Sequence, residues 1–338
     1  KNSGVPAQYI LCEHALVPCY YLYDTTFDVS PSSMGLLHRE LLCGTMAAED
    51  LQKKEVPTMT RNAVFVITGA PCTGKSTLAA WLCRRLPQPV EGLRTLCTGR
   101  CEAGALFSLQ NLADGTVTPV TQREAGQVTT LYTVWDSNGA GVLQAALQGE
   151  AGTILMDEAL PPNPHCPAWN EALAAVLAGE RSVVLTTAKE TLPALLALCG
   201  DRAVQCLDLD ETGPENLRAA LADTLPVPLH AGVSVRLFRE EKCFGAGPMQ
   251  LLELVGRTGS LHKAAAAMGM AYSKAWKMLG ELERQWGFAM LERRPGGTGG
   301  GGSLLTPRAW ELLRRYRALQ WETEHAARQA FTRWFGDF

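Results

Sequence analysis

The chain has 338 residues, of which 46% are hydrophobic and 19% are charged, and its formal net charge is −3. This length and apolar fraction allow two or three domains with buried cores, and they exclude a disordered chain, a collagen and a coiled-coil rod. No run of residues approaches the roughly 20 apolar positions that a membrane span needs, so we expect no membrane partner.

The cysteines favour a reducing compartment. There are 11 of them, scattered along the chain, and some lie inside apolar segments, as Cys83 and Cys199 do. Free cysteine in such a segment behaves as a small buried hydrophobe, and an odd count argues against a complete disulfide framework. We therefore expect free thiols and a cytoplasmic protein.

The net charge of the chain conceals two unlike parts. Residues 232–338 contain 16 Lys and Arg against 10 Asp and Glu, whereas the rest of the chain contains 15 against 24. The near-neutral total argues against a nucleic-acid partner, but a basic C-terminal part beside an acidic remainder indicates that the two parts meet different partners.

Composition and motifs divide the chain into three segments. Residues 1–58 are apolar and aromatic in places but carry no motif, so no function is assigned to them. Residues 59–226 alternate between short apolar runs and helical patterns. The proline-containing linker PVPLHAG follows and predicts a boundary, after which residues 232–338 form a mainly helical segment.

The middle segment predicts an α/β domain with a mostly parallel sheet and flanking helices. Its first strand, AVFVITG at 63–69, is continuously apolar, as expected of a strand buried on both faces. Further strands are predicted at 93–97, 105–112, 116–120, 128–135, 153–159, 182–188 and 204–210, and helices at 75–86, 141–149, 169–179, 191–200 and 214–225. Asp114-Gly115 is the expected hairpin turn.

A phosphate-binding loop follows the first strand. Residues 69–76, GAPCTGKS, match the pattern G-x-x-x-x-G-K-[ST] between a strand and a helix. Such a loop points main-chain N–H groups at phosphate oxygens, and the helix N-terminus adds partial positive charge. The predicted nucleotide-binding residues are Gly69, Thr73, Gly74, Lys75, Ser76 and Thr77. The alternative is a chance glycine turn.

Individual roles follow from the chemistry of nucleoside triphosphates such as ATP or GTP. Lys75 is predicted to reach the β- and γ-phosphates, and the Ser76 hydroxyl to bind Mg²⁺. Asp157, at the end of the apolar run TILM, is the expected second Mg²⁺ residue, and Glu158 is placed to polarise the attacking water. An ordinary acidic strand end is the alternative for this pair.

Thr186 and Thr187 end another predicted strand of the sheet. They have two interpretations: they sense the γ-phosphate, or they are polar residues at a strand end.

The middle segment, over residues 62–225, resembles the small P-loop nucleoside-triphosphatases of the THEP type. The resemblance rests on the phosphate loop, the LADG hairpin, the strands ending in Asp157-Glu158 and Thr187, and the segment PENLRAAL. It implies slow hydrolysis of ATP, GTP and other nucleoside triphosphates with little base preference. The chain has Cys72 where that family usually has glycine, and residues 159–162 lack the family's glycine and second glutamate.

The C-terminal segment contains a helix-turn-helix pattern. Ser260 can cap the helix LHKAAAAM, Gly269 makes the turn, and a second helix begins near Ala271. Base edges and phosphates of double-stranded DNA would meet the start of this second helix. The predicted DNA-binding residues are Ser260, Tyr272, Ser273, Lys274, Lys277, Arg293 and Arg294. Trp276 is expected in the core, and a plain helical bundle is the alternative for the segment.

This segment resembles the winged helix-turn-helix domain of ModE-type molybdate regulators, which are related to LysR-type DNA-binding domains. The resemblance rests on residues 258–260, 264–269, 272–276 and 291–293, and on the glycine-rich stretch 296–302 that leads into Leu305-Thr306-Pro307. It implies a winged domain and a homodimer. The chain as given reaches Phe338 without an oxyanion-binding domain, so molybdate sensing is not expected of it.

A long helix is predicted over 307–334. Trp310, Leu313, Tyr316 and Leu319 recur on it at helical spacing. This stripe either forms a dimer seam or packs against its own domain.

The two signatures together predict a nucleotide-binding transcription regulator, in which triphosphate binding or hydrolysis is coupled to DNA binding. One alternative is a nucleoside-triphosphate phosphohydrolase or kinase whose basic C-terminal domain only localises it. A weaker alternative is an interaction module with an inactive phosphate loop.

Overall fold

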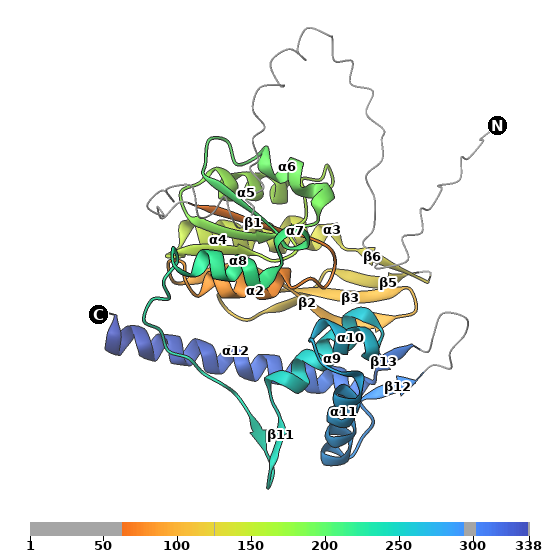
Figure 1. The fold of residues 1–338 in the computed structure, drawn as a ribbon. Coiled ribbons are helices and arrows are strands. Elements are labelled where there is room, and N and C mark those ends of the chain that lie inside the picture. The colour runs from red at the N-terminus through yellow and green to blue at the C-terminus, as the bar shows by residue number, and fades with distance from the viewer. Residues whose placement is uncertain (1–62, 125, 294–301, 337–338) are drawn as a thin grey trace, which may run out of the picture.

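The computed structural model describes residues 63–124, 126–293 and 302–336. The unassigned segment 1–58, the predicted DNA contact Arg294 and most of the glycine-rich stretch lie outside these ranges. The described chain forms two units that lie against each other, which we call the sheet unit (63–225) and the C-terminal unit (237–336) (Figure 1).

The sheet unit is built on a seven-stranded sheet in the order β4-β3-β2-β7-β8-β1-β9. The strands are β1 (Val64–Thr68), β2 (Val90–Cys101), β3 (Gly104–Asn111), β4 (Val117–Pro119), β7 (Thr153–Met156), β8 (Ser182–Thr186) and β9 (Val204–Asp208). The five strands from β2 to β9 in this order pair in parallel, and β3 and β4 add an antiparallel edge. The predicted α/β class with a mostly parallel sheet is therefore confirmed.

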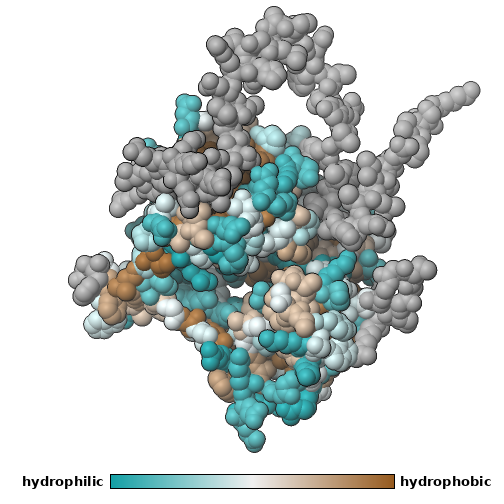
Figure 2. Space-filling view, in the orientation of Figure 1, coloured by the Kyte–Doolittle hydropathy of each residue, from teal (hydrophilic) through white to brown (hydrophobic). Residues whose placement is uncertain are grey.

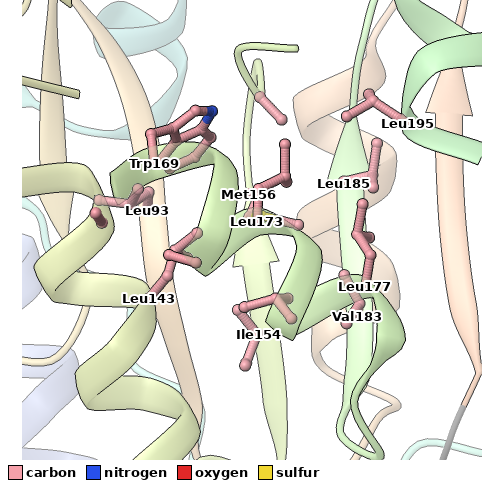
Figure 3. Close-up of a cluster of buried hydrophobic side chains, with 14 of the residues drawn as sticks. Leu93, Leu143, Ile154, Met156, Trp169, Leu173, Leu177, Val183, Leu185 and Leu195 are labelled. Carbon is pink, nitrogen blue, oxygen red and sulfur yellow. The ribbon is translucent and has the colours of Figure 1, made fainter. Parts of the chain in front are cut away.

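Helices cover both faces of the sheet because its central strands are apolar throughout. Along β1, Val64 and Val66 join one core and Phe65 and Ile67 join the other. On the first face lie α4 (Ala140–Gln148), α5 (Pro167–Ala178) and the short α6 (Leu192–Leu196), and on the second face lie α2 (Lys75–Cys83) and α8 (Pro214–Ala222). Figure 3 shows Leu143 of α4 and Leu173 and Leu177 of α5 among side chains of β7 and β8 in the first core.

One predicted strand is only partly correct. Residues 127–130 form β6 (Gln127–Thr130), which pairs with β5 (Thr121–Glu124) in a separate hairpin. The chain then turns into α3 (Tyr132–Val134) and a π-helical turn, Trp135–Gly139, instead of continuing the strand to 135. Trp135 is buried there and its ring meets Trp169 edge-on, with the ring centroids 4.9 Å apart. This tertiary contact outweighs the β propensity of the apolar run.

The C-terminal unit has its own core, formed mainly by α9 (Ala246–Thr258), α10 (Leu261–Ala267), α11 (Tyr272–Trp286) and α12 (Pro307–Phe335). Two hairpins accompany the helices: β10 (Leu237–Phe238) with β11 (Lys242–Phe244), and β12 (Leu291–Arg293) with β13 (Ser303–Leu305). The second hairpin flanks the glycine-rich stretch, as a wing does. The remaining helix is α7 (Leu209–Thr212) in the sheet unit, beside a 3-10 turn, Lys189–Thr191.

The long helix α12 packs against its own unit near its start. Leu313 and Tyr316 are buried in the C-terminal core, and the Tyr316 hydroxyl donates to the Val235 carbonyl oxygen at 2.8 Å. Leu319 is exposed. The stripe predicted on this helix thus packs within the unit at Leu313 and Tyr316, and the homodimer stays a prediction.

The two units meet where α9 and α12 lie along β2 and β3 (Figure 1). Arg100 of β2 donates from Nη1 to the carbonyl oxygens of Gly256 and Arg257, at 3.3 and 2.5 Å. Further along, Gly115 lies so close to Trp321 of α12 that a Cβ at Gly115 would be 2.7 Å from the indole ring. Arginine contacts and one close glycine–tryptophan approach therefore fix the C-terminal unit on the sheet edge.

A glycine inside β2 provides a test of the sheet. Gly92 has φ +109°, and a Cβ there would lie 2.3 Å from the main-chain oxygen of Leu155 in the neighbouring β7. We expect Gly92→Ala to lower the free energy of unfolding by about 3 kcal/mol or more, because neither backbone can withdraw. Thermal denaturation followed by circular dichroism measures this.

Gly141 of α4 is the matched control, because a Cβ there has open space within 4 Å. Gly141→Ala should leave stability unchanged or raise it by up to about 1 kcal/mol. Equal stability of the Gly92→Ala variant and the wild type would contradict the description of β2.

Candidate functional site: a phosphate loop beside a helix-turn-helix unit

The phosphate loop connects the buried strand β1 to helix α2. Three of its residues have positive φ: Gly69 (+137°), Cys72 (+64°) and Gly74 (+103°), the last being the residue before the helix. These angles turn the chain sharply from the strand into the first turn of α2, whose N–H groups then point out of the helix end. A Cβ on Gly74 would have no neighbour within 4 Å, so the space over the loop is open.

Lys75 folds back across the loop. Its Nζ donates to the carbonyl oxygens of Gly69 and Ala70, both at 2.8 Å. Burial lowers the pKa of Lys75, and the neighbouring Glu158, Cys72, Asp210 and Asp157 oppose that shift. The loop therefore holds one ammonium group inside its curve, where phosphate oxygens could replace the carbonyl partners.

Asp157, which follows β7, is buried with 3% of its surface exposed. Its Oδ1 accepts hydrogen bonds from Ser76 Oγ and Thr186 Oγ1, both at 2.8 Å. Its carbonyl oxygen accepts from Thr95 Oγ1 at 2.7 Å. The hydroxyl and carboxylate oxygens of Ser76 and Asp157 are thus adjacent, and oxygen donors of this kind suit Mg²⁺.

Glu158 is held in an unusual backbone conformation. Its φ is +58°, a region that costs a non-glycine residue roughly 1–3 kcal/mol. Its N–H donates to Thr186 Oγ1 at 2.7 Å, which helps to hold that conformation. Burial raises the pKa of the Glu158 carboxyl, Asp157 acts in the same direction, and the guanidinium of Arg257 opposes both. The strained backbone turns the side chain of Glu158 toward the C-terminal unit.

Arg257, from α9 of the C-terminal unit, contacts this carboxylate. Its Nη1 lies 3.1 Å from Glu158 Oε1, and its Nη2 donates to the Thr95 carbonyl oxygen at 3.5 Å. Burial alone would lower the pKa of Arg257. The carboxylates of Glu158 and Asp157 outweigh this effect and raise the pKa above its usual value, so the guanidinium stays charged. Sequence reasoning missed Arg257, because no pattern links a helix 99 residues away to the end of β7.

A second missed group is Asp210, which follows β9. Both of its carboxylate oxygens accept from the Ala70 N–H at 3.0 Å, and this bond is the first cause that lowers the pKa of Asp210. Lys189 Nζ lies 2.7 Å from Asp208 and 3.2 Å from Asp210. The signal in the sequence was the acidic end of the strand VQCLDLD, which resembles the end of β7.

The structure brings most of the predicted nucleotide residues to one edge of the sheet. Gly69, Thr73, Gly74, Lys75, Ser76 and Thr77 form the loop and the first turn of α2, and Asp157 and Glu158 follow β7, which β8 separates from β1 in the sheet. Thr186 uses its hydroxyl on Asp157 and Glu158, and the Thr187 hydroxyl pairs with that of Thr191. The hydrogen bonds of Thr186 fit a residue that positions the two carboxyl groups.

The start of α11 presents the predicted DNA contacts to solvent. Tyr272, Ser273, Lys274 and Lys277 are exposed, whereas Ala275, Leu279 and Leu282 are buried against the rest of the unit. Figure 2 shows hydrophilic residues, mixed with less polar ones, over the lower part of the molecule, where α11 lies in Figure 1. A basic, exposed first turn on the second helix of the motif is the arrangement that reads a major groove.

The prediction that Trp276 lies in the core is wrong. Trp276 is 38% exposed, and its ring stacks with Tyr272 at a centroid distance of 6.2 Å. His262 of α10 lies 5.9 Å from Tyr272. The helical spacing places Trp276 four residues from Tyr272, on the solvent side of α11, so both rings belong to the exposed face.

The other predicted contacts flank this face. Ser260 caps α10, since its Oγ accepts from the Lys263 N–H at 3.3 Å. Arg293 lies in β12, opposite Ser303 of β13, and the predicted contact Arg294 lies outside the described residues. Ser260 and Arg293 thus belong to the cap of α10 and to the β12–β13 hairpin, where DNA backbone contacts are expected.

Comparison with known proteins places the DNA-binding resemblance in the same region. The family model described as "Bacterial regulatory helix-turn-helix protein, lysR family" matches residues 248–309. The molybdenum transport protein ModE of Herbaspirillum seropedicae is 43% identical over 70 residues, which are 21% of this chain and 26% of that protein. The DNA-binding transcriptional dual regulator ModE of Escherichia coli K12 is 31% identical over 93 residues, or 27% of this chain and 35% of that protein.

A third relative, the molybdenum-pterin-binding protein MopB of Rhodobacter capsulatus, is 36% identical over 76 residues, 22% of this chain and 28% of that protein. The chain therefore spans about a third or less of the length of these relatives. The C-terminal unit is similar to the helix-turn-helix part of ModE-type regulators, as the sequence predicted.

Two solved structures are similar to about half of the chain. The crystal structure of THEP1 from the hyperthermophile Aquifex aeolicus is 18% identical with a TM-score of 0.36, and covers 48% of this chain and 96% of its own. The solution structure of a human cancer-related nucleoside triphosphatase is 18% identical with a TM-score of 0.37, and covers 50% of this chain and 100% of its own. These values carry no conclusion about activity.

Within the described ranges, no helix combines the length and apolarity that crossing a bilayer needs.

Thr186 provides a test of the carboxylate geometry. Its side chain is fully buried and serves both Asp157 and the Glu158 N–H. Thr186→Val keeps the shape but removes the acceptor of the Glu158 N–H and one of the two donors to Asp157 Oδ1, so we expect it to lower the free energy of unfolding by about 1–3 kcal/mol. Thr186→Ser, which keeps the hydroxyl, should lose less than half of that amount. Thermal denaturation of both variants measures the difference, and equal stability of Thr186→Val and wild type would contradict the two hydrogen bonds.

Proposed function

We propose that the chain is a nucleotide-binding transcription regulator. In it, binding of ATP, GTP or another nucleoside triphosphate to the phosphate loop is coupled to sequence-specific binding of double-stranded DNA by the C-terminal unit. The observation that carries this proposal is the contact between the two sites. The end of α9, three residues before Ser260, touches the carboxylate that follows Asp157.

For nucleotide binding, we assign Lys75 to the β- and γ-phosphates and the loop N–H groups from Thr73 onward to the remaining phosphate oxygens. Ser76 and Asp157 would hold Mg²⁺, which supplies Lewis-acid stabilisation of charge on the phosphates when it is bound. Their oxygens lie 2.8 Å apart, which supports a shared ion in place of the hydrogen-bond proton. Thr186 would keep Asp157 oriented toward Ser76 in that state.

For hydrolysis, we assign Glu158 as the group that polarises water and accepts its proton. Its carboxylate comes directly after the Asp157 that would face the metal, and the positive φ aims it away from the strand axis. This acidic pair supports the alternative function as well, a nucleoside-triphosphate phosphohydrolase or kinase whose basic unit only localises it. Both functions need the same residues at the phosphate site. The measurement that separates them is therefore the effect of nucleotide on DNA affinity.

For DNA binding, we assign α11 to the major groove, with Tyr272, Ser273, Lys274 and Lys277 near base edges and phosphates. Ser260, Arg293 and Arg294 would contact the DNA backbone on either side. A homodimer would present two such helices to two half-sites. We take residues 59–226 and 232–338 as the two domains of the regulator, and the cytoplasm, where DNA and triphosphates occur together, as its location.

Lys75→Ala separates the candidate functions. Removing the ammonium should weaken binding of a fluorescent ATP analogue at least about tenfold, because the phosphates lose a charge-assisted partner. DNA affinity should be measured with and without ATP, GTP and their non-hydrolysable analogues, at two salt concentrations. If nucleotide changes the DNA affinity of the wild type but not of the variant, the sites are coupled.

Two other outcomes contradict the proposal in different ways. Loss of turnover in Lys75→Ala, with no nucleotide effect on DNA in the wild type, would favour the localised enzyme. Failure of the wild type to bind any nucleotide would favour an interaction module with an inactive loop.

The salt dependence of DNA binding tests the assignment of α11. Each phosphate contact steepens the plot of log affinity against log salt, so Lys274→Ala and Lys277→Ala should each reduce its slope by roughly 1 on a random-sequence duplex. Arg123→Ala removes an exposed charge from β5 of the sheet unit and is the matched control, with an unchanged slope expected. An unchanged slope in both lysine variants would contradict the assignment.

A further inference from the structure

The contact between Arg257 and Glu158 differs from the other arginine contacts across the boundary of the units. Arg100 donates to the carbonyl oxygens of Gly256 and Arg257, and Arg317 donates from Nη1 to the Cys97 carbonyl oxygen at 2.9 Å. Those bonds join an arginine side chain to main-chain oxygens. Arg257 instead crosses the boundary to a side chain beside the phosphate loop, and its own side chain is only 26% exposed.

The position of Arg257 is itself fixed from both sides. Its carbonyl oxygen accepts from Arg100 of β2, and its Nη2 reaches the Thr95 carbonyl oxygen of the same strand. Glu158 is equally constrained, since its N–H is bonded to Thr186 and its backbone is left-handed. Two side chains that start from fixed backbones and meet at 3.1 Å leave the carboxylate little freedom to rotate.

The charge around Glu158 also calls for a cation on this side. Asp157 directly precedes Glu158, so the site contains two carboxylates. Lys75 is the cation on the loop side. A half-buried pair of like charges is unfavourable without compensation. The guanidinium of Arg257 provides that compensation from the C-terminal unit.

We propose that Arg257 is a positioning residue for hydrolysis: it fixes the carboxylate of Glu158 through Oε1 and leaves Oε2 to accept a proton from the attacking water. The water oxygen bonds to the γ-phosphorus as the bond from that phosphorus to the β–γ bridging oxygen breaks, and nucleoside diphosphate and phosphate leave. The proposal rests on the proposed nucleotide-binding function and deepens it. It makes the hydrolytic site complete only while the C-terminal unit is seated against β2 and β3. Hydrolysis then depends on the C-terminal unit, although the role assigned to Arg257 requires no contact with nucleotide or DNA.

The chain connects this contact to the predicted DNA surface within three residues. Gly259, at φ +67°, ends α9 against the Arg100 guanidinium, where a Cβ would be 2.8 Å from Nε. The Gly259 carbonyl oxygen accepts from the Ser303 N–H of the wing at 2.9 Å, and Ser260 then caps α10. A shift of α10 or of the wing on DNA would therefore move the backbone that holds Arg257, which is a physical path for coupling.

The test uses the full-length chain and steady-state hydrolysis of ATP and GTP with Mg²⁺. Arg257→Ala should lower kcat roughly ten- to hundredfold, because the carboxylate loses its fixed orientation. Its affinity for a fluorescent ATP analogue should stay within about twofold of wild type, because no phosphate contact is removed. Arg257→Lys, which keeps the charge, should recover part of the loss.

Two matched variants separate positioning from general weakening of the boundary. Arg317→Ala removes a comparable contact between the units, the bond to the Cys97 carbonyl oxygen, without touching Arg257 or Glu158, and its kcat should stay within about threefold of wild type. Adding Arg257→Ala to Glu158→Gln should lower the residual kcat no further, whereas a purely structural role would lower it again. Melting temperatures of all variants show whether each one is folded. If Arg257→Ala does not fold, Arg257→Lys takes its place in the comparison.

The outcomes distinguish the two proposals. If the wild type binds and hydrolyses nucleotide while Arg257→Ala has an unchanged kcat, the positioning role is wrong and the proposed function stands. A higher kcat in Arg257→Ala also overturns it, since Arg257 would then be withholding the carboxylate. If the wild type binds no nucleotide, the proposed function fails and the positioning role fails with it.

Discussion

The buried carboxylate of Asp157 joins more of the sheet unit than any local feature of the sequence suggests. The carboxylate of Asp157 accepts from the hydroxyl groups of Ser76 in α2 and Thr186 in β8. The main-chain carbonyl oxygen of Asp157 accepts from the hydroxyl group of Thr95 in β2. A buried carboxylate has to be satisfied in this way, because an unpaired one would cost several kcal/mol. The need to satisfy it brings the phosphate loop, the acidic strand end and the neighbouring strand into register. The same register places Glu158 where the second unit can reach it.

Local patterns suffice for the parts of this molecule that depend on local chemistry. The phosphate loop was predictable because its left-handed turns and the helix behind it are encoded within residues 69–76. Ser260 and Gly269 were predictable for the same reason, since a cap and a left-handed turn each act within a few residues. The parallel sheet followed from strands that are apolar on both faces.

The remainder depends on contacts between distant residues, and the sequence shows no trace of them. Arg257 looks like an ordinary last-turn residue of a helix, and only the seating of α9 on β2 brings it to Glu158. Trp276 was misplaced because an aromatic residue on an amphipathic helix usually faces the core, whereas here Ala275 and Leu279 supply that face. The strand expected through residue 135 failed where burial of Trp135 against Trp169 dominated. In each case tertiary packing selected among conformations that the local sequence allows equally.

Charge distribution explains how a chain of net charge −3 can meet two kinds of anion. Under the proposed function, the acidic sheet unit would need no basic surface for phosphate, because main-chain N–H groups and Lys75 would supply the attraction. The basic C-terminal unit, in turn, has several arginines in ion pairs with glutamates. Arg284, Arg314, Arg315 and Arg317 pair within the unit, and Arg257 pairs with Glu158 of the sheet unit. Lys274 and Lys277, at the exposed start of α11, take part in none of these pairs, so their charge is available to DNA. The basic residues of this unit thus include some that are available to DNA and some that form ion pairs. Arg257 belongs to the second group, and its partner lies in the sheet unit.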